Sequence, residues 1–186
     1  MLWGAASGAL ELRADNKGGV RVSGRFPYNH ETELAPGRAE RIEARAFAAR
    51  IEAGEDIHLL FGHDYQRPLA SRQAGSLEIT DTDDALEFRA TINGSTSWAA
   101  DFLAAHEAGL IRGMSPGFRV SKGGERIERR GDGLLRSVSK AELFEISAVT
   151  RGAYGQAQIE ARAWECDQDE KFSSCTGLHP LNRWRL

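Results

Sequence analysis

Hydrophobic and polar residues alternate with a period of two along two neighbouring stretches in the middle of the chain. The stretches are Leu77 to Ile79 and Leu86 to Ile92, and the polar segment Thr80 to Asp84 separates them. Alternation places every second side chain on the same face of a β-strand, and a polar segment between two such runs is typical of a turn. The pattern therefore predicts an antiparallel hairpin with one face directed toward the core.

Other short segments also have the residue content of strands and are bounded by residues that favour turns. Leu10 to Arg13 and Val20 to Phe26 flank Asp15-Asn16-Lys17-Gly18-Gly19, whose residues tolerate positive φ, so this region predicts a second hairpin. The apolar run Ile57 to Phe61 is short, as in a strand that is buried on both faces. Later strands are predicted at Gly117 to Ser121, Leu134 to Val138 and Leu143 to Thr150.

Helix formers are concentrated in two stretches. One runs from Arg38 to Ala53, with its second half the stronger, and stops at Gly54, whereas Pro27 to Gly37 has the composition of a loop. In the other, Ser97 can cap a helix that extends through Ala108. Because strands dominate and rarely alternate singly with helices, we predict a mainly β fold with helices (α+β). The expected architecture is an antiparallel β-barrel flanked by two or three helices.

The regular pattern weakens after about residue 157, where a polar run is followed by residues without clear periodicity. We therefore expect one domain at 1–157 and a mobile C-terminal tail at 158–186. The tail contains Cys166 and Cys175. Two late cysteines are too few for a disulfide framework or a zinc knuckle, so we assign them no role.

Composition argues against several classes of partner. The chain has 186 residues, of which 41% are hydrophobic and 27% charged, and its net charge is −3. This balance fits a globular domain and lacks the basic excess of a nucleic-acid-binding surface. No run approaches the roughly 18 apolar residues that span a bilayer, and the first residues lack the pattern of an export signal. We expect a cytoplasmic protein with no cofactor and with neither nucleic acid nor membrane as a partner.

Ser115 lies between two glycines in Gly113-Met114-Ser115-Pro116-Gly117. Flanking glycines favour a tight turn that presents a serine hydroxyl free of neighbouring side chains. The spacing matches the nucleophile elbow of α/β-hydrolases, but Pro116 has no N–H to donate to an oxyanion. Ser115 is thus either a nucleophile with its base upstream and another oxyanion donor, such as the N–H of Gly117, or a turn serine without a catalytic role.

His63 ends the most apolar predicted strand, in Phe61-Gly62-His63-Asp64-Tyr65. The core can hold an imidazole in this position while its tip faces a cleft. Histidine is the side chain that most often serves as a general base near neutral pH, so His63 is a candidate base. The alternative is a histidine that packs beside the core and has no catalytic role.

Glu145 lies within the otherwise apolar predicted strand Leu143 to Thr150. Burial of an unpaired carboxylate is costly, so Glu145 needs a cationic or hydrogen-bonding partner. An imidazolium that forms on His63 would be one such partner, and Glu145 would then orient the base as the third member of a triad. A structural ion pair is the alternative, with Arg112, Arg119 or Arg151.

The histidine, serine and carboxylate motifs, in this order, resemble the prohead protease family of tailed phages, which is similar in fold to the herpesvirus assemblins. The resemblance covers about Val20 to Ala157. Departures from the family pattern lie outside the candidate triad: Gly152 replaces a frequent proline, and Arg45 and Ala70 replace frequent glycines. The matching segments are Leu59 to Asp64 with Pro68-Leu69, Ile111 to Phe118, and Leu143 to Thr150 with Ala153-Tyr154.

This resemblance implies a serine protease with Ser115 as nucleophile and His63 as base. Assemblins have a second histidine as the third member, whereas in the phage proteins that position resembles Glu145. By analogy with an arginine of assemblins, the backbone N–H of Arg151 is an oxyanion candidate beside that of Gly117. The implied substrates are the major capsid protein and a scaffold segment, cut inside the assembling procapsid in the host cytoplasm. Self-cleavage and a homodimer are further expectations from the resemblance.

Two other functions stay open on the residues alone. The protein could be a catalytically inactive structural or scaffold component of the phage particle. Alternatively, Asp56, His58, His63 and Asp64 could hold a metal ion for hydrolysis, because aspartate and histidine are suitable ligands. Strand alternation, however, places His58 and His63 on opposite faces, which disfavours the metal site.

Overall fold

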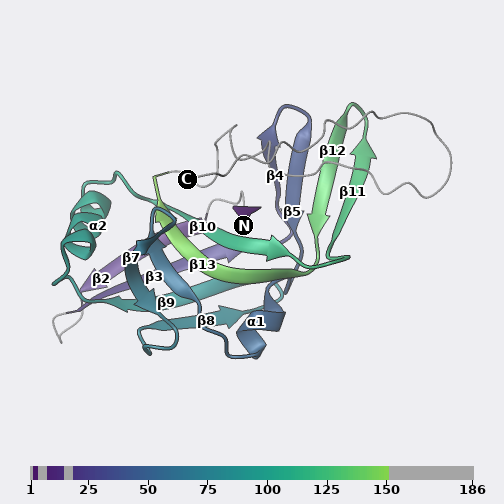
Figure 1. The fold of residues 1–186 in the computed structure, drawn as a ribbon. Coiled ribbons are helices and arrows are strands. Elements are labelled where there is room, and N and C mark those ends of the chain that lie inside the picture. The colour runs from purple at the N-terminus through teal and green to yellow at the C-terminus, as the bar shows by residue number, and fades with distance from the viewer. Residues whose placement is uncertain (1, 4–7, 15–18, 151–186) are drawn as a thin grey trace, which may run out of the picture.

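The computed structural model describes residues 2–3, 8–14 and 19–150, and two β-sheets dominate this part of the chain (Figure 1). The larger sheet has nine strands in the order β7-β6-β13-β10-β2-β3-β9-β8, with β1 paired to β10 outside this path. Its strands are β1 (Leu2–Trp3), β2 (Gly8–Ala14), β3 (Val20–Pro27), β6 (His58–Phe61), β7 (Asp64–Ser71), β8 (Leu77–Asp81), β9 (Ala85–Ile92), β10 (Gly113–Val120) and β13 (Ala141–Val149).

The pairing within the larger sheet confirms both predicted hairpins, β2–β3 and β8–β9. At its centre β10 and β13 are antiparallel, whereas β6 lies parallel to β13 on the other side. The expectation of a wholly antiparallel arrangement was therefore wrong. The mainly β, α+β fold is confirmed. Among the described strands, hydrogen-bonded pairing does not join β7 to β8, so the closed barrel is not confirmed.

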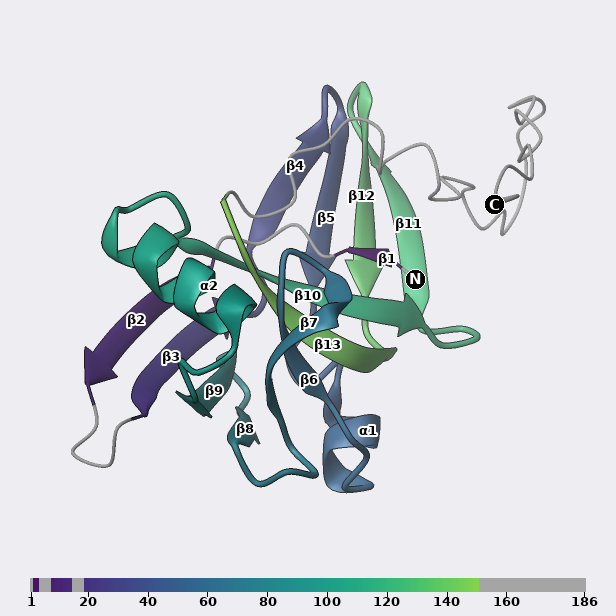
Figure 2. The ribbon, with the colours of Figure 1, turned by 60° about the vertical axis from the view of Figure 1, so that its left-hand side comes forward.

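The smaller sheet consists of two hairpins that extend away from the larger sheet (Figures 1 and 2). The hairpins are β4–β5 and β11–β12, and β5 and β12 pair in parallel at the middle of the sheet. The second hairpin contains the arginine-rich segment 126–130, most of whose side chains are half-buried or exposed. The four strands are β4 (Glu31–Ala35), β5 (Arg38–Ile42), β11 (Glu125–Arg130) and β12 (Gly133–Val138).

This sheet corrects two predictions about the first third of the chain. The segment Pro27 to Gly37, predicted as a loop, contains β4, and the helix predicted from Arg38 begins only at α1 (Ala48–Glu52). Strand β5 occupies the first part of that predicted helix because its backbone pairs with neighbours on both sides, and this tertiary pairing outweighs helix propensity.

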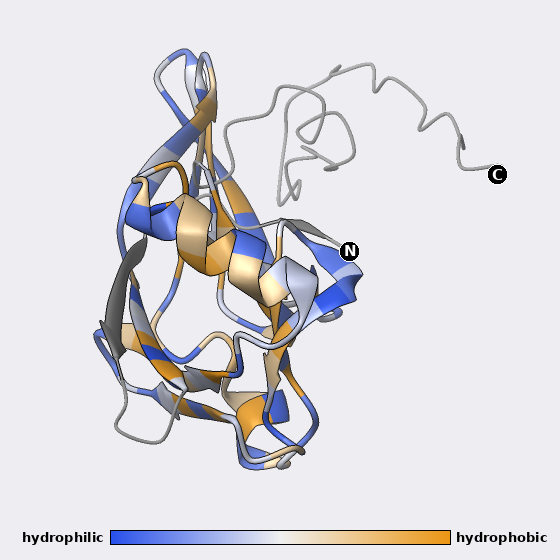
Figure 3. Cartoon of the chain, turned by 90° about the vertical axis from the view of Figure 1, so that its left-hand side faces the viewer, coloured by the Kyte–Doolittle hydropathy of each residue, from blue (hydrophilic) through white to orange (hydrophobic). Residues whose placement is uncertain are grey.

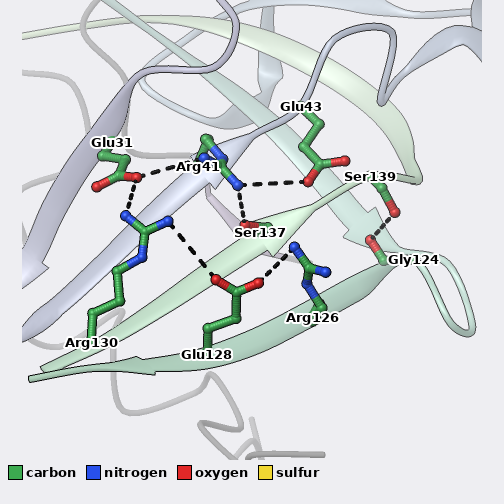
Figure 4. Close-up of polar contacts among 9 residues, drawn as sticks. All are labelled: Glu31, Arg41, Glu43, Gly124, Arg126, Glu128, Arg130, Ser137 and Ser139. Carbon is green, nitrogen blue, oxygen red and sulfur yellow. Dashed lines mark hydrogen bonds and ion pairs between the residues drawn. The ribbon is translucent and has the colours of Figure 1, made fainter.

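Charged side chains bind one another on both faces of the smaller sheet. On one face, Arg130 forms an ion pair with Glu31 at 2.8 Å, and Arg130 and Arg126 both form ion pairs with Glu128 (Figure 4). On the other, the buried Arg136 binds Glu40 at 2.8 Å and Glu125 through its Nε at 2.6 Å. Opposite charges on neighbouring strands therefore attach the β4–β5 hairpin to the β11–β12 hairpin.

The hydrophobic core lies against the inner face of the larger sheet. Hydrophobic and hydrophilic positions alternate along its strands (Figure 3), and Phe47 and Phe118 pack with ring centroids 5.4 Å apart. The predicted second helix is confirmed as α2 (Ser97–Glu107), which buries Phe102 against Phe61, although its N-cap is Thr96. None of the helices in the described ranges is long and apolar enough to cross a membrane.

Candidate active site

Ser115 lies inside strand β10, not on the turn that its glycine neighbours predict. The backbone from Gly113 to Gly117 pairs residue by residue with β13, so the glycines remain extended. Met114 and Phe118 are buried in the core. Because neighbouring side chains of a strand point to opposite faces, Ser115 and Gly117 lie on the face of the sheet that is turned away from this core.

A β-bulge in β13 brings Glu145 to the same face. Gly117 pairs with Glu145, but the next residue, Phe118, pairs with Leu143, so Phe144 has no counterpart on β10. The extra residue changes the alternation, so that Leu143 and Ile146 both enter the core while Glu145 and Ser147 point away from it. The acid thus lies within a mostly apolar strand without pointing into the core.

His63 is held in the tight turn between β6 and β7. Its φ is 64° and that of Gly62 is 66°, both in the left-handed region, which costs an L-residue about 1–2 kcal/mol. Two hydrogen bonds hold the turn against β13. The N–H of Gly62 donates to the carbonyl of Ala148 at 3.0 Å, and the N–H of His63 donates to Oγ of Ser147 at 3.0 Å.

The side chains of His63 and Glu145 meet directly. Nδ1 of His63 lies 2.8 Å from Oε1 of Glu145, and Glu145 is fully buried. Its second oxygen, Oε2, accepts a hydrogen bond from Oγ of Ser147 at 2.5 Å. The predicted contact between the histidine and the acid is therefore present, and Arg119, one of the alternative partners, instead reaches Glu142 at 3.9 Å.

Ser115 is placed beside this pair by the strand register. It lies directly opposite Ser147 in the β10–β13 pairing and is itself fully buried. Ser147 in turn contacts both the backbone of His63 and the carboxylate of Glu145. Strands β10 and β13 and the β6–β7 turn thus bring together three residues that are far apart in sequence. The proposed oxyanion donor Gly117 follows two residues after Ser115, while Arg151 lies outside the described residues.

Sequence reasoning named Gly117 only as an oxyanion donor, so its steric role was missed, and it missed Ser147 altogether. Gly117 leaves space for the acid, because a Cβ at this position would overlap Oε1 and lie 2.7 Å from Cδ of Glu145. Ser147 binds the acid and the backbone of the candidate base. A signal for Ser147 did exist, since a residue two positions from Glu145 on a strand lies on the same face.

Two aromatic residues are neighbours in sequence of the histidine and the acid, Tyr65 near His63 and Phe144 next to Glu145. Tyr65 follows His63 by two residues and is 49% exposed. Partial burial, and then the charge of Glu145, raise the pKa of the Tyr65 phenol, while Arg50 opposes the shift. The guanidinium carbons of Arg50 and Arg119 lie 4.3 and 5.3 Å from the centroid of the Phe144 ring. Two guanidinium groups therefore lie close to the ring of the residue that precedes the acid.

The four residues of the alternative metal site do not converge. His58 pairs with Asp56 at 3.4 Å, whereas His63 contacts Glu145. Asp64 binds the N–H of Gln66 and lies near Arg67. Within residues 19–150 and the short described N-terminal strands, no three His, Cys, Asp or Glu side chains are grouped as metal ligands.

A carboxylate on Nδ1 of a histidine, with a serine on the adjacent strand, is the arrangement of a serine hydrolase of the triad type. The family comparison is in agreement with this class. The model of the caudovirus prohead serine protease family matches residues 8–172, and the chain belongs to this family. No curated protein and no solved structure matches the chain.

Proposed function

We propose that the protein is a serine endopeptidase with Ser115 as nucleophile, His63 as general base and Glu145 as the acid that orients the base. The observation that carries this proposal is the 2.8 Å contact between Nδ1 of His63 and the buried Oε1 of Glu145. It fixes the tautomer that leaves Nε2 to accept a proton, and it stabilises the imidazolium that results.

The reaction is acyl transfer in two stages. Oγ of Ser115 forms a bond to the peptide carbonyl carbon while its proton passes to Nε2 of His63. The carbon–nitrogen bond then breaks, and the amine leaves with that proton. Water next attacks the acyl-enzyme with His63 again as base, which releases the acid product and restores Ser115. For the oxyanion we propose the backbone N–H groups of Gly117 and Arg151 as donors.

The family supports a place for this activity in phage capsid maturation. We propose that the substrates are the major capsid protein and a scaffold segment, cut inside the assembling procapsid in the host cell, and that the protease also cleaves itself. High local concentration within a shell would let a slow enzyme complete this processing. A homodimer, which the assemblin resemblance implies, is part of the same proposal and is tested by the mass of the purified protein in solution.

The buried acid and the space left for it by Gly117 do not favour an inactive structural role. Neither feature is needed by a sheet that only supports a particle, and both are accounted for by an oriented base. A fluorophosphonate probe separates the two functions, because only an activated serine reacts with it.

The decisive experiment is co-expression of the chain with the capsid protein of its own phage, followed by intact-mass spectrometry. We expect the wild type to shorten the capsid protein and to be labelled by the fluorophosphonate, and the Ser115→Ala variant to do neither while it keeps its circular dichroism spectrum. Ser139→Ala, which removes a hydroxyl bonded to the carbonyl of Gly124, is the matched control and should process normally. Continued processing by folded Ser115→Ala would refute the assignment.

A further inference from the structure

Ser147 connects the candidate acid to the candidate base through both of its hydrogen-bonding functions. The backbone N–H of His63 donates to its Oγ at 3.0 Å, and this hydroxyl donates to Oε2 of Glu145 at 2.5 Å. Oε1 of the same carboxylate lies 2.8 Å from Nδ1 of His63. The three contacts form a closed ring that begins at the backbone of His63 and ends at its imidazole.

The ring fixes the carboxylate and the imidazole relative to each other. A serine hydroxyl has a single proton, and here that proton goes to Glu145, so the oxygen is left to accept the N–H of His63. Hydrogen bonds that follow one another in this way polarise each other in a buried site. The carboxylate cannot rotate without breaking a bond at one of its two oxygens.

The backbone contact matters because the turn that carries His63 is strained. Gly62 and His63 both have left-handed φ values, and such residues persist only where their surroundings hold them. The N–H of Gly62 is bound by the carbonyl of Ala148 and that of His63 by Ser147. Consecutive N–H groups are thus attached to consecutive residues of β13, the strand that also carries the acid.

Burial and register make this arrangement specific to position 147. Ser147 is fully buried and lies opposite Ser115 on β10 and opposite Leu60 on β6. Its hydroxyl therefore lies between the strand of the nucleophile and the strand that leads to the base. Alanine at this position would leave the N–H of His63 and Oε2 of the fully buried Glu145 without this partner.

We propose that Ser147 is a positioning residue for the reaction, which holds the carboxylate of Glu145 and the backbone of His63 in register. This inference rests on the proposed serine-peptidase function. In this proposal Ser147 does not contact the substrate. Its effect passes through the orientation of His63, so its loss should slow the chemical step and leave substrate binding unchanged.

The test compares wild type, Ser147→Ala and Ser147→Cys by hydrolysis of p-nitrophenyl butyrate and by the rate of fluorophosphonate labelling. A small displacement of a catalytic group can cost about 100-fold in rate, so we expect kcat and the labelling rate to fall by about 10- to 100-fold, with KM within about twofold. Ser147→Cys keeps nearly the same volume with a weaker donor, so it separates lost hydrogen bonds from lost packing. Ser137→Ala is the matched control, because Ser137 is equally buried and binds Arg41 in the smaller sheet.

A spectroscopic measurement on the same variants is independent of turnover. The proton on Nδ1 of His63 should give a downfield nuclear magnetic resonance signal, identified by its absence in Glu145→Gln. We expect this signal to shift or to exchange away with water in Ser147→Ala and to persist in Ser137→Ala. An unchanged signal in Ser147→Ala, or kcat within about threefold of wild type in both Ser147 variants, would overturn the positioning role. Equal labelling of wild type and Ser115→Ala would instead refute the proposed function, and the signal would still decide the role of Ser147.

Discussion

Gly117 and Glu145 lie directly opposite each other on β10 and β13, and the absence of a side chain at Gly117 leaves the space that the carboxylate occupies. A glycine inside a strand normally weakens it and often marks a close approach of other atoms to the backbone. Here the approaching atoms belong to the buried acid. The strand that carries the candidate nucleophile therefore also determines where the acid is placed.

Gly117→Ala should displace the acid and reduce activity. The added Cβ overlaps Oε1 of Glu145 and lies 2.7 Å from its Cδ, so the carboxylate must move away from His63. We expect the labelling rate to fall by about 100-fold and the free energy of unfolding to fall by about 1–3 kcal/mol. Gly94→Ala is the control, because its Cβ would meet Leu103 at 3.4 Å, an ordinary contact. Equal labelling rates in the two variants would contradict the steric argument.

Glu145→Gln should slow the reaction by about 10²- to 10⁴-fold without unfolding the protein. The carboxylate accepts from both Nδ1 of His63 and Oγ of Ser147, but an amide has only one oxygen and turns an N–H toward one of these groups. The imidazole then loses the partner that sets its tautomer. Steady-state ester hydrolysis measures the effect, and Glu142→Gln, at a half-exposed position in β13, serves as control. A rate near that of wild type in Glu145→Gln would remove the acid from the mechanism.

Arg136→Met should destabilise the fold strongly. Arg136 is buried and binds both Glu40 and Glu125, so its loss leaves the buried carboxylate of Glu40 without this cation. Removal of one partner from a buried ion pair typically costs about 3–5 kcal/mol, which urea denaturation can measure.

Two further variants show whether the loss of stability in Arg136→Met is caused by the burial of the charge on Glu40. Arg130→Met removes an ion pair whose side chains are about half exposed, so the free energy of unfolding should change by less than about 1 kcal/mol. The double variant Arg136→Met with Glu40→Met should be more stable than Arg136→Met alone, because no carboxylate at position 40 is then buried. A double variant as unstable as the single one would contradict this explanation.

Asp81 should make the fold less stable as pH rises from acid toward neutral. Burial raises the pKa of its carboxyl above the ordinary 3.8, although the hydroxyl of Tyr28 donates to Oδ1 at 2.7 Å and lowers it. A raised pKa in the folded state means that the folded chain binds the proton more tightly than the unfolded chain. The stabilising contribution is therefore complete below about pH 3.8 and is lost as pH rises through the folded-state pKa.

Asp81→Asn tests this sign, because an asparagine oxygen still accepts from Tyr28 but carries no charge. The stability of Asp81→Asn relative to wild type should be lowest at acid pH and should increase as pH rises toward neutral. Urea midpoints measured at several pH values between about 3 and 7 would show it. If the difference in stability between Asp81→Asn and wild type stays constant over this range, the pKa of Asp81 is not raised in the folded state.

The residues of the candidate site could be found from sequence because each breaks the pattern around it. Glu145 is a charge in an apolar strand, His63 follows a buried run, and Ser115 is framed by glycines. Local pattern misled at Ser115, however, because the glycines that favour a turn are extended when the backbone pairs with β13. The glycine that matters is Gly117, because its missing side chain leaves room for the carboxylate of Glu145.

Reliance on local sequence patterns also accounts for the wrong predictions of secondary structure. Residues 38–42 have good helix propensity, but the backbone hydrogen bonds of β5 go to β4 and β12, and the partner of Glu40 is almost a hundred residues later in the chain. A preference of a few tenths of a kcal/mol per residue is smaller than the gain from such pairing. By contrast, β8 and β9 were correctly predicted because both their alternation and their turn are local.

By itself the sequence determined the strand-rich class, the local hairpins and the three side chains proposed for the site, since these depend on residue type and on spacing along a short stretch. Tertiary structure decided which strands are parallel, that the bulge at Phe144 turns Glu145 out of the core, and that Ser147 completes a ring with His63. The reason is that register between distant strands depends on many weak contacts at once, and no short segment of the chain contains that information.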